Sequence, residues 1–149
     1  MENLIANDIY ITEPTDEAVG FTAQAPSGDS FYNQNDLVIF DSTVSNIGGY
    51  YQTSSSQFLC PVDGMYAFSL NVLTGAASIF YGAIMKESAK LDSVWDDTTG
   101  ENRDTASNLV IAVCSKGERV WIRSLTDSGV LHNNINAYTT FSGFLLNRL

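Results

Sequence analysis

Short runs of β-branched and aromatic residues, separated by turn-forming residues, constrain the fold of this chain more than any other feature. Almost no segment shows the apolar spacing of an amphipathic helix, whereas clusters of Gly, Asn, Asp and Ser recur between the runs. This pattern is typical of an all-β sandwich. The sequence predicts nine strands, at residues 19–25, 37–41, 57–61, 65–73, 79–86, 90–95, 106–115, 118–125 and 138–147.

One segment, GAIMKESAKLDSVW at 82–95, resembles a helix at first sight. Its order is an apolar run, then Lys-Glu-Ser-Ala-Lys, then a second apolar run. Two apolar runs joined by a short polar stretch are typical of a β-hairpin, so we expect two antiparallel strands here.

Two of the predicted strands are apolar on both faces. No polar side chain occurs between Leu109 and Cys114, and in the closing segment Phe144 points to one side while Phe141 and Leu145 point to the other. In an antiparallel protein this pattern indicates a sheet with its core on one side and another subunit on the other. An unusually thick core is the alternative explanation.

The chain length and the charge exclude several classes of protein. A chain of 149 residues is most economically one domain, with a core large enough to need no metal or disulfide. The net charge is −10 and all seven basic residues follow position 85, which opposes binding to nucleic acid. No run approaches the ~20 apolar residues of a membrane helix, so we expect no membrane insertion.

The two cysteines, Cys60 and Cys114, lie in apolar stretches. Small disulfide-stapled domains are richer in cysteine, so the sequence predicts two buried free thiols. The first residues, MENLIANDIY, show no signal peptide. Two interpretations of the compartment stay open, an intracellular protein and a mature secreted domain.

A spaced set of aromatic, Asn and Gly residues begins at position 40. Its members are Phe40, Asn46, Tyr51, Phe58 and the run GMYAF at 64–68. This spacing resembles the signature of the complement C1q globular-head family, with one departure at Leu70, where Phe or Tyr is usual. The segments VGFTAQ, KGERVWI and YTTFSGFLL resemble further strands of that family in the same order, so the resemblance covers residues 19–146.

The resemblance implies a ten-stranded antiparallel jelly roll, similar to tumour necrosis factor, that assembles as a compact homotrimer. It implies a globular head at 19–149 after an N-terminal arm at 1–18, with no collagen-like stem in the arm. Stemless heads are common among invertebrate immune lectins of this family, some of which bind sialic acid. The resemblance therefore implies a binding module and not an enzyme.

The resemblance also implies a calcium site in the acidic loop WDDTTGENRD. Some relatives hold calcium at the top of the trimer with one aspartate on either side of this loop, and Asp96 and Asp104 match that pair. Calcium needs six to eight oxygen ligands, which two carboxylates from each of three chains could supply. The alternative is an exposed acidic loop that keeps the protein soluble.

Catalysis finds little support, because the single histidine, His132, has no recognisable nucleophile or orienting acid beside it in the sequence. Glycan binding needs aromatic faces together with amides and hydroxyls, and a sialic acid carboxylate needs a cation. The candidate ligand-binding residues are Tyr50, Arg103, Trp121, Arg123, His132, Asn133 and Asn134. Arg119, Trp121 and Arg123 share one strand face, and the alternative explanation for this face is a stacking and ion-pair contact between subunits.

These observations predict a secreted, trimeric pattern-recognition lectin that binds surface glycans, including sialic acid, in innate immunity. The alternative is a signalling ligand like tumour necrosis factor that binds a protein receptor.

Overall fold

The computed structural model describes residues 17–98, 100 and 102–149, and within them the chain is all-β. The predicted arm at 1–18 lies almost entirely outside the described residues. The strands are β1 (Gly20–Gln24), β2 (Gly28–Tyr32), β3 (Ser42–Ile47), β4 (Tyr51–Gln52), β5 (Gln57–Leu59), β6 (Gly64–Leu73), β7 (Ile79–Lys86), β8 (Ala89–Asp97), β9 (Thr105–Cys114), β10 (Arg119–Ser124), β11 (Gly129–Asn133) and β12 (Thr140–Arg148).

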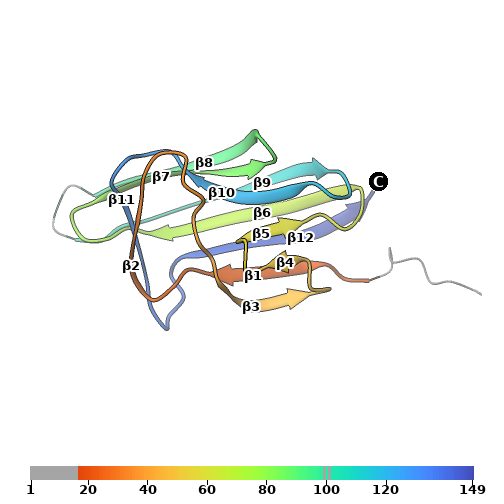
Figure 1. Cartoon of the computed structure of the whole chain (residues 1–149), viewed down its shortest axis with the longest axis horizontal. Helices are drawn as coiled ribbons and strands as arrows, with labels where there is room; N and C mark the ends of the chain where they lie inside the picture. The colour runs from red at the N-terminus through yellow and green to blue at the C-terminus, as the bar shows by residue number, and fades with distance from the viewer. Residues whose placement is uncertain (1–16, 99, 101) are drawn as a thin grey trace, which may run out of the picture.

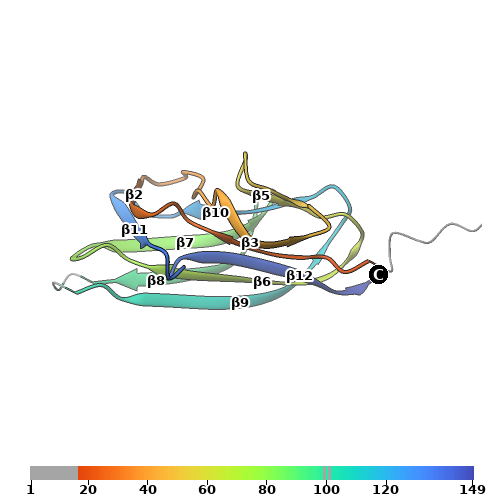
Figure 2. The same ribbon diagram turned by 90° about the horizontal axis from the view of Figure 1, so that it is seen from below.

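Ten of these strands form two five-stranded antiparallel sheets that lie face to face (Figures 1 and 2). The strand orders are β3-β1-β12-β6-β9 in one sheet and β4-β5-β10-β7-β8 in the other. Strands β11 and β2 form a separate two-stranded ribbon that crosses one end of the sandwich. The predicted ten-stranded jelly-roll sandwich is thereby confirmed.

Stacked aromatic rings fill the space between the sheets. The ring of Phe21 lies 4.8 Å from that of Tyr51 and 4.9 Å from that of Phe58, both stacked, and meets Phe141 edge-on at 5.0 Å. Offset stacking and edge-on contact are the favoured geometries for aromatic pairs. These residues come from four strands, so this cluster fixes how the two sheets pack on each other.

The closing strand β12 is central in its sheet, between β1 and β6. Phe141 is fully buried in the core, whereas Phe144 is half exposed on the opposite face. Gly143 faces the core, because an added Cβ would lie 2.6 Å from the Phe68 ring and 2.8 Å from the Phe21 ring. The two apolar faces of this strand therefore have different surroundings, one the core and the other solvent.

The structure differs from the predicted strands mainly before residue 52 and after residue 125. The 82–95 hairpin is confirmed by β7 and β8, but residues 37–41 form no strand. They follow β10 through single contacts, in which the backbone N–H of Val38 donates to the Ile122 carbonyl at 2.8 Å. Strands β2, β3, β4 and β11 were not predicted, because turn-forming residues are frequent in and beside them.

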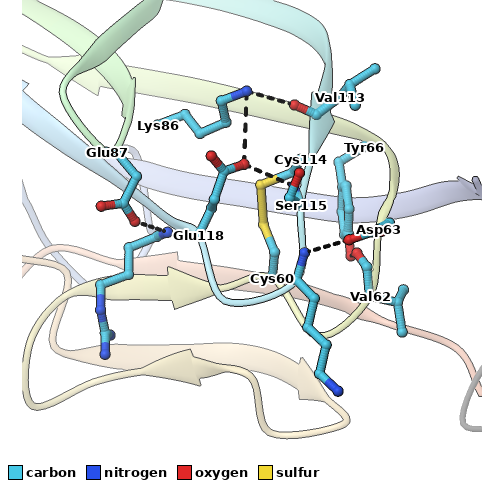
Figure 3. Close-up of a disulfide and its surroundings, with 12 residues drawn as sticks. Cys60, Val62, Asp63, Tyr66, Lys86, Glu87, Val113, Cys114, Ser115 and Glu118 are labelled. Atoms are coloured by element: carbon cyan, nitrogen blue, oxygen red, sulfur yellow. Dashed lines mark hydrogen bonds and ion pairs between the residues drawn. A yellow bond between two sulfur atoms is a disulfide. The ribbon is translucent and has the colours of Figure 1, made fainter.

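The prediction of free thiols is wrong, because Cys60 and Cys114 form a disulfide (Figure 3). Cys60 follows β5 and Cys114 ends β9, and their Cα atoms lie 6.6 Å apart across 54 residues of sequence. The Cys60 N–H donates to the Glu118 carbonyl at 2.9 Å, and the Gly117 N–H donates to the Cys60 carbonyl at 2.8 Å. This pairing of the β9–β10 turn with the end of β5 brings the two sulfur atoms together.

No helix in the described part of the chain is long and apolar enough to cross a membrane.

Candidate functional site

The predicted ligand-binding residues do not gather into one site. Tyr50 directly precedes β4, a strand in the half of the sandwich that also holds the C-terminus (Figure 1). His132 and Asn133 are the last two residues of β11 and Asn134 follows them, and β11 lies at the opposite end of the sandwich (Figure 1). Tyr50 is half-buried against the core, where it covers Gly48, a glycine with a φ of 90°. The loops at the β11 end are therefore the better place for a ligand that contacts several of these residues.

Arg103 and His132 meet at a residue that the sequence did not indicate, Asp29 on β2. His132 Nδ1 lies 2.6 Å from Asp29 Oδ1, and an Arg103 guanidinium nitrogen lies 3.6 Å from the same oxygen. The pairing of Asp29 with His132 across the β11–β2 ribbon places the two side chains together. Because 103 residues separate them in the sequence, no local pattern could have shown this contact.

Asn133 and Asn134 have different environments. Asn133 is 1% exposed, and its amide donates to the Ala25 carbonyl at 2.7 Å and accepts from the Thr139 N–H at 3.2 Å. Its side chain is thus not available to a ligand, and its role is to hold two loops together. Asn134 is partly exposed and lines an open depression next to β1 and β3.

Trp121 and Arg123 lie on the outer face of β10, as predicted, together with Arg119. The Trp121 indole N–H donates to the Glu87 carbonyl at 3.1 Å, which fixes the ring against the β7–β8 turn. The Arg123 Nε is buried without a hydrogen-bond partner in the described residues. Neither Arg119 nor Arg123 forms an ion pair within that part of the chain. The ion pairs suggested by the sequence would join two subunits, so they stay a prediction.

The sheet that contains β10 also carries an aromatic pair that the sequence analysis did not select. The rings of Tyr81 and Trp95 stack with centroids 3.9 Å apart, and Trp95 is 71% exposed. The two residues are paired across β7 and β8. The signal available in the sequence was an aromatic residue, Trp95, at the end of the predicted strand 90–95.

Asp96, one of the two predicted calcium ligands, is a buried carboxylate. It is 3% exposed and its Oδ2 has no hydrogen-bond partner within the described residues. Burial, followed by the charges of Asp104 and Asp97, raises the pKa of Asp96 from 3.8 to about 6. An unpartnered buried carboxylate oxygen with acidic neighbours fits a bound cation, which would offset the cost of burying the charge.

The acidic loop is incomplete as a metal site within one chain. Among the described residues no three His, Cys, Asp or Glu side chains gather closely enough to hold a metal ion. Glu101, which lies in the same loop, is outside the described residues. Asp96 and Asp104 could therefore supply only part of a calcium coordination shell, which needs six to eight oxygens.

The sheet that contains β12 has an exposed apolar outer face. Leu109, Ile111 and Val113 of β9 are about half exposed, as is Phe144 of β12. Ile111 and Phe144 both lie opposite Ala67 of β6, so the apolar side chains of three adjacent strands are contiguous. A small hollow of about 70 Å³ opens beside Phe144 and Leu109. A monomer would leave this face in contact with water.

Comparisons with known proteins assign the fold and the family. Residues 20–146 match the C1q domain family. The chain is 32% identical over 117 residues to complement C1q tumor necrosis factor-related protein 3 of Mus musculus, covering 78% of this chain and 47% of that protein. It is 28% identical over 139 residues to Caprin-2 of Danio rerio, covering 93% of this chain and 15% of that protein. The chain thus spans half or less of the length of these relatives.

Solved structures agree with this assignment. The globular domain of the zebrafish complement 1qA protein superimposes with a TM-score of 0.72 at 19% identity, covering 88% of this chain and 99% of that one. Murine APRIL superimposes with a TM-score of 0.69 at 10% identity, covering 87% of this chain and 100% of that one. The chain belongs to the C1q domain family and has the jelly-roll fold of these proteins. The family's proteins serve in recognition and signalling and are not enzymes.

Proposed function

We propose that this protein is a secreted recognition head that forms a homotrimer and binds surface glycans through several copies of one weak site. The observation that carries the proposal is the contiguous apolar outer face of β9, β6 and β12, described above. A soluble protein with this face gains stability by covering it with another subunit. The remaining loops then stay free for a ligand.

The chemistry of the loops near β11 supports a polar, hydroxyl-rich ligand. His132, Asn134 and Arg103 lie on partly exposed loop or ribbon positions, and Trp95 presents an aromatic ring to solvent. Amides, carboxylates and exposed rings are the groups that bind sugar hydroxyls and the apolar faces of sugar rings. Three copies of such a site would raise apparent affinity by roughly 10²–10⁴ on a surface that offers several ligands.

The disulfide between Cys60 and Cys114 supports secretion. Disulfides persist in oxidising compartments and are rare in the cytosol. Of the two interpretations that the sequence left open, a secreted domain agrees better with this bond.

Calcium is part of the same proposal. Asp96 and Asp104 would hold the ion, each chain contributing oxygen ligands to a site at the threefold axis. The buried, unpartnered Oδ2 of Asp96 supports this assignment. Bound calcium would supply positive charge that offsets the repulsion between neighbouring carboxylates.

A glycan array probed with the intact trimer tests the proposed function. We expect binding to a limited set of glycans, and loss of the signal when free sugar of the same type is added. Absence of any glycan signal, together with saturable binding to a protein on cell surfaces, would overturn the proposal in favour of a receptor-binding ligand.

A further inference from the structure

A depression of about 530 Å³ opens where three separate segments of the chain meet. The end of β1 and the loop after it form one side, the start of β3 forms the second, and the β11–β12 loop forms the third. Its lining includes Gln24, Ser27, Asp41, Ser42, Asn134 and Ile135. The volume lies within the range of about 300–1,000 Å³ that is usual for small-molecule sites.

Most of the polar groups in this depression are not used by the protein itself. The side chains of Gln24, Ser27, Asp41 and Ser42 make no hydrogen bond to any residue in the described part of the chain. Asn134 accepts one hydrogen bond through Oδ1, from the Asn136 N–H at 2.8 Å, which leaves its amide donors free. The depression therefore offers one carboxylate, two amides and two hydroxyls to a ligand.

Buried side chains fix the two loops that carry these groups, the loop after β1 and the β11–β12 loop. Asn133 links the two loops through its hydrogen bonds to Ala25 and Thr139. The Thr139 hydroxyl donates to the His132 carbonyl at 2.7 Å and accepts from the Leu73 N–H at 3.0 Å. Every polar atom of these two buried side chains is thus engaged. Such a supporting layer keeps the groups above it in a fixed geometry.

The side of the depression formed by the start of β3 is also fixed by buried side chains. Phe40, directly before Asp41, is fully buried, and its backbone is bonded by two buried side chains. Its N–H donates to the Ser56 hydroxyl at 2.9 Å, and its carbonyl accepts from the Tyr51 hydroxyl at 2.7 Å. Asp41 therefore extends from an anchored backbone while its own side chain remains in solvent.

Charge and shape define the ligand. Asp41 is the single charged side chain in the lining, so the depression repels carboxylated sugars and attracts hydroxyl donors. The nearby Arg103 is already paired with Asp29 and does not line the depression. Ile135 is 96% exposed at the rim and offers an apolar surface. A neutral hexose, with hydroxyls on its edges and C–H groups on its faces, matches this combination.

We propose that this depression is a binding site for a neutral hexose at the end of a glycan, with Asp41 and Asn134 as its hydrogen-bonding residues and Ile135 against the sugar face. The assignment rests on the proposed glycan-binding function and narrows it to uncharged sugars. Asn133 and Thr139 act as positioning residues beneath the site.

Nuclear magnetic resonance of the isotope-labelled full chain tests the site. The probes are the methyl glycosides of mannose, galactose and N-acetylglucosamine, with sialyllactose as the charged comparison. We expect one or more of the neutral glycosides to shift the backbone amides of residues 24, 25, 27, 41, 42, 134 and 135, and sialyllactose to leave them unchanged. The variant Asp41→Asn should weaken the affinity roughly tenfold, because a hydrogen bond to a charged acceptor is lost. Asp127→Asn, an exposed aspartate outside the depression, is the matched control and should bind as the wild type does.

The possible results of this experiment distinguish failure of the proposed hexose site from failure of the proposed glycan-binding function. A neutral glycoside that binds with shifts elsewhere, and with full affinity in Asp41→Asn, overturns the site while glycan binding stands. Binding of sialyllactose at these residues overturns the preference for uncharged sugars. The absence of binding to any probe here, alongside a blank glycan array, overturns both proposals.

Discussion

At the scale of single residues, Asp96 is the most informative group. A carboxyl group whose pKa is raised to about 6 by burial, and then by Asp104 and Asp97, is destabilising when it is ionised. Among the buried residues of the described part of the chain, Asp96 alone carries an ionisable carboxyl group, and its burial needs a reason beyond stability. A bound cation supplies such a reason, since it would convert an unfavourable charge into a ligand.

The pH dependence of stability follows from this shift. The folded protein holds the Asp96 proton up to about pH 6, whereas the unfolded chain releases it near 3.8. The contribution of Asp96 to folding therefore becomes less favourable as the pH rises from about 4 to about 6. In calcium-free buffer, Asp96→Asn should melt at a higher temperature than the wild type, by a margin that grows over this pH range and then levels off. A margin that is constant with pH would contradict the raised pKa.

At neutral pH, calcium should make the wild type melt at a higher temperature than Asp96→Asn, the reverse of the order in calcium-free buffer. Added calcium should raise the melting temperature of the wild type, because a ligand that binds only the folded state stabilises it. The double variant Asp96→Asn/Asp104→Asn should show no rise, and magnesium is the control cation for the wild type. An equal rise in the double variant would place the calcium at other residues.

The disulfide gives a further prediction at this scale. Closing a loop between residues 54 apart removes conformational freedom from the unfolded chain, worth about 4 kcal/mol in the chain-entropy treatment. Cys60→Ala/Cys114→Ala should lower the melting temperature at a fixed protein concentration, and dithiothreitol should lower that of the wild type alone. A dithiothreitol effect of similar size in the double variant would show that the reductant acts elsewhere.

At the scale of elements, the closing strand β12 depends on the absence of a side chain at position 143. An added Cβ would come within 2.6 Å of the Phe68 ring and 2.8 Å of the Phe21 ring, both of which are buried. Neither ring can move freely, since Phe21 is stacked between Tyr51 and Phe58. The packing of the central strand thus requires glycine for space, and no unusual backbone angle is involved.

Gly143→Ala should destabilise the fold by about 1–3 kcal/mol through overpacking. Gly100→Ala is the matched control, since an added Cβ there meets no atom within 4 Å. Urea denaturation, followed by fluorescence at one protein concentration, measures both. Equal midpoints for the two variants would mean that the Phe rings adapt to the methyl group.

At the scale of the whole molecule, we expect the apolar face of β9 and β12 to determine the proposed assembly. In solution the wild type should have about three times the 16.2 kDa mass of the chain. Ile111→Asp should yield a folded monomer, because the side chain is half exposed in the subunit and a charge there opposes only the contact between subunits. Phe31→Asp, which changes an apolar and still more exposed position on β2, should leave the mass unchanged.

Light scattering coupled to gel filtration measures these masses, and circular dichroism verifies that both variants are folded. The monomer should also lose apparent affinity for a glycan-coated surface by roughly 10²–10⁴ while its affinity for free sugar is unchanged. A wild-type mass of one subunit at micromolar concentration would contradict the trimer.

The sequence by itself determined the class of fold, the hairpin at 82–95 and the doubly apolar strands. These depend on local alternation, which neighbouring residues display directly. The motif spacing from Phe40 onward also located the family, because its buried aromatic residues occur in a fixed order along the chain.

Only the tertiary structure decided which distant residues meet. The pairing of Asp29 with His132 joins residues 103 apart, and the bond between Cys60 and Cys114 joins residues 54 apart. The depression at Asp41 likewise brings the β11–β12 loop to two segments from the first third of the chain. Strands β2 and β11 likewise exist because they pair with each other, since each alone is rich in residues that favour turns. Local preference decides whether a segment is extended, whereas the packing of the whole chain decides what lies beside it.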